Sequence, residues 1–330
     1  MNRSGLDWRA ATYALLKEAW SASLPLIKIT VPVVILVRIF HLMGLNVWIN
    51  QGLSPFMTWV GLPPEAGIVW ASALVGNLYS AFLVFLSHAG DLQLTVSQVT
   101  VLMTMVLVAH SFPMELRVTQ LVGIRVMYMG CLRFFGAIVT GWVLTKVYAS
   151  LGLFQTIAPL PALSAQGPAT GWADWALGEV RNLFMIYFIV LALILLMKIL
   201  RLLRVDVLLE YVMWPLNALL KTDQKTTSFN VIGMIAGISY GGALMMNELK
   251  QRAFTRRDIL VTMTFMGLAH GLIEETLLMM ALGAHWSGVL LGRLLLAVAA
   301  AFLLGGALML LPVLVNSRLL ANSRLRVISN

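Results

Sequence analysis

The sequence predicts an all-α polytopic membrane protein built from two inverted-topology repeats, and its composition, its apolar segments and an internal repeat all point that way. Of its 330 residues, 60% are apolar and 11% are charged, with a mean hydropathy of +0.88. So few polar side chains cannot cover the surface of a soluble globule. The net charge of +9 comes from basic residues that lie between apolar segments, which indicates topology signals and argues against nucleic acid as a partner.

Eight apolar segments are long enough to cross the ~30 Å hydrocarbon core of a bilayer. They cover residues 22–42, 66–88, 98–122, 124–148, 180–203, 228–248, 258–281 and 286–315. The first residues lack the apolar core of a signal peptide and are expected to lie at the membrane interface. The expected parts are an amphipathic interfacial helix at 1–21, repeat 1 at 22–149, a periplasmic linker at 150–179, repeat 2 at 180–316 and a basic cytoplasmic tail at 317–330.

The repeat has a spacing of 160 residues. Residues 101–110, VLMTMVLVAH, align with residues 261–270, VTMTFMGLAH. The same register pairs charged residues, namely Glu115 with Glu275 and Arg133 with Arg293. Repeats of this length in an apolar chain are typical of transporters, in which the substrate site lies at the repeat interface.

Charge placement predicts that the second repeat is inverted. Basic residues flank segment 228–248 on both sides, including Lys221 before it and Lys250 after it. Both of its ends therefore favour the cytoplasm, and the segment is expected to enter the membrane and return as a hairpin. Glycines interrupt this segment, and Gly76 interrupts its counterpart 66–88, which suits a tight reversal. Alternatively, the glycines only let neighbouring helices pack closely.

One hairpin and three spanning helices in each repeat give an odd number of crossings, which inverts the second repeat. We expect a multi-pass protein of the bacterial cytoplasmic (inner) membrane with both termini in the cytoplasm, because the predicted outer segments contain no Lys or Arg. These segments are 43–65, 88–97, 149–180 and 282–288. Two short stretches, 45–57 and 205–217, are expected to lie as horizontal arms at the interface.

Ionisable side chains lie at mid-membrane depth in both repeats. His110 and Glu115 fall within segment 98–122, and Pro113 between them is expected to kink or break the helix. The second repeat has His270, Glu274 and Glu275 at the equivalent depth. His270 and Glu274 would share a helix face, whereas Glu275 would point elsewhere unless the helix unwinds. An ionised group at mid-bilayer costs ~2.5–3.5 kcal/mol, so these groups need partners.

Arg133 and Arg293 are the candidate partners, and two interpretations compete. Each arginine could pair with a glutamate of its own half and only hold helices together. Alternatively, all of these groups converge on a central site where carboxylates or histidines exchange protons and the arginines meet an anion. The remaining polar candidates for substrate or ion binding lie at the two hairpins; they are Asn77, Tyr79, Ser239 and Tyr240.

The layout resembles the Gate-domain, or nucleoside-recognition, family of membrane proteins. That family includes spore maturation proteins A and B, the pore part of ferrous-iron transport protein B and, more distantly, concentrative nucleoside transporters. The resemblance lies in two halves, each with an interrupted segment followed by a helix such as LMTMVLVAHSFPMEL or VTMTFMGLAHGLIEET. It implies that the hairpins act as gates and that Asn77, Glu115, Glu274 and Glu275 line the path. The sequences GNLYSAF and GISYGGA depart from the hairpin motif of that family, so neither nucleoside nor iron follows as a substrate.

These observations predict a secondary transporter, proton-coupled, for a small polar or anionic solute or the head group of a lipid carrier. The alternatives are a membrane scaffold with structural charges and a divalent-metal permease using the histidines and glutamates. The sequence contains no phosphate loop, paired cysteines or zincin motif, so we expect neither an enzyme nor a cofactor or resident metal. The expected partners are the lipid bilayer, the solute and further copies of the chain in a homo-oligomer.

Overall fold

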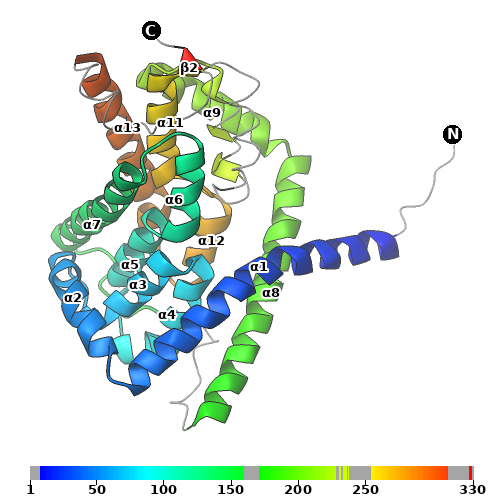
Figure 1. Cartoon of the computed structure of the whole chain (residues 1–330), viewed down its shortest axis with the longest axis vertical. Helices are drawn as coiled ribbons and strands as arrows, with labels where there is room; N and C mark the ends of the chain where they lie inside the picture. The colour runs from blue at the N-terminus through cyan, green and yellow to red at the C-terminus, as the bar shows by residue number, and fades with distance from the viewer. Residues whose placement is uncertain are drawn as a thin grey trace.

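The computed structural model describes residues 8–159, 171–227, 230–231, 233–235, 237, 254–310 and 327–328, and these are almost entirely helical (Figure 1). The first half contains α1 (Trp8–Leu42), α2 (Asn46–Trp59), the short turn η1 (Pro64–Ala66), α3 (Gly67–Val75), α4 (Leu78–Leu92), α5 (Val96–Val108), α6 (Phe112–Leu121) and α7 (Val126–Ser150). The second half contains α8 (Trp172–Leu202), α9 (Val205–Leu220), α11 (Arg256–Leu268), α12 (Glu274–Ala281), the π-helical turn η2 (Ser287–Gly292) and α13 (Arg293–Leu310). The two-residue strands β1 (Phe254–Thr255) and β2 (Val327–Ile328) pair in parallel.

Four helices among the described residues are long and apolar enough to cross a membrane, and the bent pair of α5 and α6 can make a fifth. The four are Thr12–Leu42, Val126–Ser150, Trp172–Leu200 and Ser287–Met309. The remaining expected crossing, 258–281, is divided between the shorter helices α11 and α12. The second expected hairpin, 228–248, lies mostly outside the described residues. The outward surface is apolar, as lipid requires: Phe184 and Leu303, for example, are 64% and 71% exposed.

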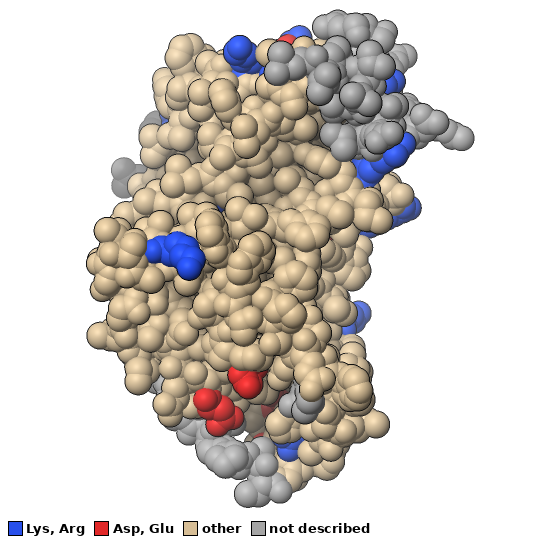
Figure 2. Space-filling view, turned by 90° about the vertical axis from the view of Figure 1, so that its left-hand side faces the viewer, with Lys and Arg blue, Asp and Glu red and all other residues tan. Residues whose placement is uncertain are grey.

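Charged side chains are few on the face seen in Figure 2 and are not confined to its two ends. Lys and Arg lie mostly in the upper half, with others at mid-height and lower down, and Asp and Glu lie mainly near the lower end. The rest of this face is uncharged, as expected for a protein that contacts hydrocarbon.

The first expected hairpin is helix, break and helix. Helix α3 ends at Val75, and Asn77 caps α4 by accepting a hydrogen bond from the backbone N–H of Ser80 at 2.8 Å. The expected horizontal arms correspond to α2 and α9. The expected interfacial helix at 1–21 is not separate in its described part, because α1 continues from Trp8 to Leu42 through Pro25 and Pro32. The tail expected at 317–330 lies outside the described residues except for β2.

The 160-residue spacing of the sequence is also present in the backbone. Helices α5 and α11 begin and end 160 residues apart. Each is capped by a threonine side chain, because Thr95 accepts a hydrogen bond from the N–H of Gln98 and Thr255 accepts one from the N–H of Asp258. A glycine with positive φ follows α6 and α12 at equivalent places, with 96° at Gly123 and 93° at Gly283. The two halves therefore share local structure as well as sequence.

The helix break predicted at Pro113 is present. Helix α5 ends at Val108, α6 begins at Phe112 with Pro113 in its first turn, and the two are bent by 41°. The break is a left-handed residue, Ser111, with φ of 49°. Its N–H donates to the carbonyl of Ala73 in α3 at 2.9 Å, so a backbone group freed by the break is satisfied inside the protein.

The second half repeats this arrangement between α11 and α12. Gly271 has φ of 54°, and its N–H donates to the carbonyl of Gly233 at 3.1 Å. Both members of this hydrogen bond are 160 residues beyond their counterparts in the first half. Each half thus holds a broken helix against the segment that precedes it, and the two breaks carry His110 and His270.

A buried charge cluster as the candidate functional site

Six of the predicted site residues meet in one place, which we call the charge cluster. They are His110, Glu115, Arg133, His270, Glu275 and Arg293. The two arginines are completely buried, Glu115 and both histidines are at most 3% exposed, and the Glu275 side chain is 13% exposed. Ionisable groups at this burial need compensation from one another.

Each arginine pairs with the glutamate of its own half. Arg133 Nη1 lies 2.5 Å from Glu115 Oε2, and Arg293 Nη2 lies 2.9 Å from Glu275 Oε2. The Nε of each arginine donates to the last carbonyl of a broken helix at 2.9 Å. Those carbonyls belong to Val108 at the end of α5 and Leu268 at the end of α11. A cation at a helix C-terminus is favourable. Arg133 thereby links α7 to the end of α5, and Arg293 links α13 to the end of α11.

The histidines join the two halves. His110 Nε2 lies 3.1 Å from Glu115 Oε1 and 3.7 Å from Glu275 Oε1. His270 Nε2 lies 3.4 Å from Glu115 Oε2 and 3.6 Å from Glu275 Oε1. The two imidazole centroids are 5.3 Å apart. Glu115 and Glu275, paired by the sequence repeat, therefore contact the same two imidazoles.

Backbone contacts fix which nitrogen of each histidine faces the carboxylates. Nδ1 of His110 lies 3.0 Å from the Val106 carbonyl, and Nδ1 of His270 lies 2.9 Å from the Met266 carbonyl. A carbonyl only accepts, so each Nδ1 carries a proton and a neutral imidazole presents its Nε2 lone pair. At 3.1 Å from a carboxylate oxygen, that lone pair of His110 needs a shared proton or a cation.

The cluster also contains polar atoms with no hydrogen-bond partner among the described residues. They include Nη2 of Arg133, Nη1 of Arg293 and Nε2 of His270. Buried groups of this kind cost free energy unless something pairs with them. They are the atoms of the cluster that remain available to a ligand.

Glu274 and Asn77 lie outside the charge cluster. Glu274 accepts a hydrogen bond from the Tyr79 hydroxyl at 3.3 Å. The sequence placed His270 and Glu274 on one helix face and Glu275 elsewhere unless the helix unwinds. The chain is not helical just before α12, and Glu275 is the glutamate that contacts His270. Asn77 accepts from Thr30 and Ser80 as a helix cap. Ser239 and Tyr240 lie outside the described residues.

The left-handed residues at the two breaks were not among the predicted site residues, although a glycine beside His270 was a visible signal in the second half. A Cβ built on Gly271 would overlap the Glu275 side chain. At the equivalent place in the first half, Ser111 already has a side chain with φ of 49°. The two halves therefore differ in how closely the glutamate approaches the break.

We expect Gly271→Ala to lower the stability of the protein by about 1–3 kcal/mol, because it combines left-handed strain with displacement of a buried carboxylate. The matched change Ser111→Gly removes a side chain from a strained position and should change stability by less than about 1 kcal/mol. Thermal unfolding of the two variants in detergent, compared with the wild type, measures the difference. Equal losses in both would show that the contact with Glu275 is not what matters.

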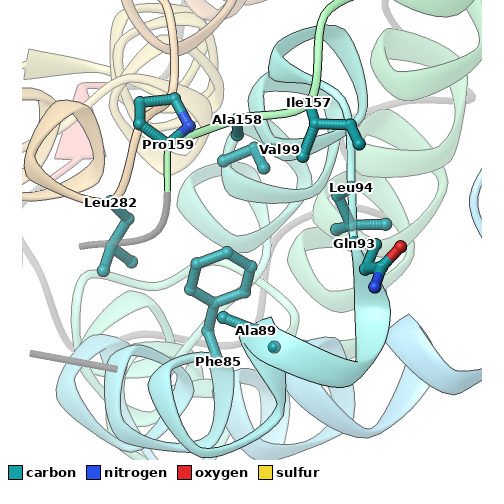
Figure 3. Close-up of a pocket in the computed structure, with 10 residues that line it drawn as sticks. Phe85, Ala89, Gln93, Leu94, Val99, Ile157, Ala158, Pro159 and Leu282 are labelled. Atoms are coloured by element: carbon teal, nitrogen blue, oxygen red, sulfur yellow. The ribbon is translucent and has the colours of Figure 1, made fainter. Parts of the chain in front are cut away.

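Two cavities lie apart from the charge cluster. One, of about 250 Å³, is mostly apolar and lies between the end of α4, the start of α5 and the chain that follows α7, where Phe85, Leu94, Ile157 and Leu282 line it (Figure 3). The other, of about 310 Å³, has ionisable side chains in a mostly apolar lining; they are His41, Glu65, His88 and Asp91. None of the predicted site residues lines either cavity.

Helices of spanning length, an apolar exterior and buried charges define a helical, multi-pass membrane protein. The chain is similar to YvoD of Bacillus subtilis (strain 168), an uncharacterized membrane protein, with 25% identity over 279 residues, 82% of this chain and 86% of the relative. No family model matches the chain. No solved structure matches it. The similarity supports the membrane-protein class and does not extend to the Gate-domain family in particular.

Proposed function

We propose that the protein is a secondary transporter, proton-coupled, that moves a small polar or anionic solute or a lipid-carrier head group through the charge cluster. The observation that carries this proposal is that equivalent histidine, glutamate and arginine residues of the two halves meet in one buried site. Transporters built from repeats place their sites at such an interface. Ionisable groups inside a membrane protein are costly and are normally retained for function.

A scaffold is the principal alternative, and the histidines argue against it. The pairs Arg133–Glu115 and Arg293–Glu275 would be enough to fasten helices within each half. A scaffold has no need for two imidazoles between the carboxylates of both halves, at 3.4 and 3.7 Å from the glutamate of the opposite half. Such contacts are suited to passing protons between groups.

We further propose that the two repeats are inverted in a bacterial cytoplasmic membrane. In support, α2 lies at the lower end of the molecule in Figure 1 and its counterpart α9 lies towards the upper end. Most of the basic side chains visible in Figure 2 lie in the upper half of the molecule, which by the positive-inside rule favours the upper end as the cytoplasmic side. In that membrane, the proton gradient would supply the energy for solute uptake.

Cysteine labelling tests the topology, with Cys131→Ser as the background because Cys131 is exposed. Cysteines at Gln224 and Arg256, which flank the second expected hairpin, should both react only from the cytoplasm. A cysteine at Gln155, after α7, should react only from outside. Reaction of positions 224 and 256 from opposite sides would exclude the hairpin and make the repeats parallel.

Transport is tested in proteoliposomes with solutes chosen by a thermal-shift screen of metabolites and lipid phosphates. We expect a solute that stabilises the wild type to accumulate when the outside is made acidic, and accumulation to collapse with an uncoupler. A scaffold would show no flux under any gradient. Accumulation that persists with both the pH gradient and the membrane potential dissipated would exclude proton coupling, and dependence on sodium would make Glu115 and Glu275 sodium ligands.

A further inference from the structure

The charge cluster has the geometry of a metal site. Its ligating atoms in His110, Glu115 and His270 all lie within 4.8 Å of one another, and all three residues are buried. Oε1 of Glu275 lies 3.7 and 3.6 Å from the two Nε2 atoms. Four ligands at ~2.1 Å from a tetrahedral ion stand about 3.4 Å apart. The four histidine-to-glutamate distances, from 3.1 to 3.7 Å, bracket that value.

The hydrogen bonds around the histidines also suit metal binding. Both Nδ1 atoms donate to backbone carbonyls, of Val106 and Met266. Metal-bound histidines commonly make this contact, because it fixes the ring and leaves the Nε2 lone pair for the metal. Nε2 of His270 has no hydrogen-bond partner among the described residues, although the residue is only 1% exposed. A cation between the rings would satisfy it.

The arginines hold the carboxylates in place around this centre. Arg293 pairs with Oε2 of Glu275, which leaves Oε1 facing the histidines. Arg133 pairs with Oε2 of Glu115, while Oε1 faces His110. Carboxylate ligands are usually oriented by hydrogen bonds to their other oxygen. The same arrangement leaves each glutamate oriented before any ligand arrives.

We propose that the charge cluster binds one divalent transition-metal ion through Nε2 of His110, Nε2 of His270 and a carboxylate oxygen of Glu115, with Glu275 at the fourth position. Two imidazoles and one or two carboxylates favour Zn²⁺, Fe²⁺ or Co²⁺ over Mg²⁺ and Ca²⁺, which prefer all-oxygen sites. The ion would take the place between imidazole and carboxylate that a proton otherwise fills, so Zn²⁺ should also inhibit proton-coupled transport.

Titration of the purified full-length protein with Co²⁺ and Zn²⁺ tests the inference. Co²⁺ should give the intense visible bands of a four-coordinate ion with one equivalent bound, and Zn²⁺ should displace it. Single changes His110→Gln and His270→Gln should each raise the Kd for Zn²⁺ by about 100-fold or more, beyond the roughly 10–100-fold typical for loss of an outer partner. The double change should abolish the Co²⁺ bands.

The cavity near His88 provides the matched control, since its lining also contains histidines and carboxylates. His88→Gln should leave the Co²⁺ spectrum unchanged. X-ray absorption at the zinc edge of the wild type requires no variant and should show about two imidazole nitrogens at ~2.0–2.1 Å and one or two oxygens.

Bands lost in His88→Gln but kept in the double histidine variant would overturn the inference, as would an octahedral all-oxygen zinc spectrum or no binding at all. The binding assay is independent of transport. Metal binding without any solute flux would refute the proposed transport function and support the metal site. Proton-driven flux without metal binding would refute the metal site and support the transport function.

Discussion

Replacing Arg293 with methionine should destabilise the protein by about 3–5 kcal/mol, the range typical for leaving one member of a buried ion pair without its partner. Arg293 is completely buried and pairs with Glu275 at 2.9 Å. Its Nε also satisfies the carbonyl at the end of α11. Methionine fills a similar volume, so the loss would come from the charge and the hydrogen bonds. Thermal unfolding and size-exclusion behaviour in detergent measure it.

The double change Arg293→Met with Glu275→Gln separates structure from function. Because the unpaired charge is the main cost, the double variant should recover most of the lost stability. If the pair belongs to a transport site, the recovered protein should still be inactive. Full recovery of transport would mean that the ion pair between Arg293 and Glu275 has only a structural role. Arg117→Met is the matched control, since Arg117 is exposed on α6, and it should change stability by less than about 0.5 kcal/mol.

Changing Glu275 alone to glutamine should abolish accumulation of the solute against its gradient while leaving exchange of pre-loaded solute. Exchange requires the loaded site to open on alternate sides but no net movement of protons, whereas accumulation requires both. Glu275 contacts both histidines and is the most exposed member of the charge cluster, with 13% of its side chain exposed. Glutamine keeps its size and some of its hydrogen bonds.

Matched glutamine variants locate the coupling group. Glu274→Gln should retain accumulation, since Glu274 contacts Tyr79 and lies outside the charge cluster. Proteoliposome uptake with an imposed pH gradient, measured beside exchange in the same preparation, gives both rates. Equal loss of accumulation and exchange in Glu275→Gln would show that this residue binds solute and is not specific to coupling.

Much of the charge cluster could be predicted from the sequence, because its residues either lie beside a helix-breaking proline or recur in both repeats. Pro113 predicted the broken helix, and the 160-residue register paired the two arginines and the two glutamates. The cost of burying charge then required that these groups meet. The structure brings together six of the eleven candidate binding residues, and each arginine pairs with the glutamate of its own half.

The remaining details depend on tertiary structure. Glu275 lies in the charge cluster in place of Glu274 because the left-handed residue Gly271 interrupts the helix. The regular helical spacing from which Glu274 was predicted to face His270 is therefore lost. The role of Asn77 as a helix cap depends on α1 lying beside it, through the contact with Thr30. The tautomers of the histidines are set by carbonyls at the ends of α5 and α11. Periodicity carries no information on such contacts.

Cross-linking can test whether the two halves contribute to one buried site. In the Cys131→Ser background, His110→Cys with His270→Cys should be joined within the monomer by dibromobimane, because the two imidazole centroids are 5.3 Å apart. Fluorescence on the monomer band and a cross-linked peptide in mass spectrometry report the link, and His110→Cys with Gln155→Cys is the control pair. We expect an efficient link for the first pair only. A monodisperse, folded double variant that does not cross-link would contradict it.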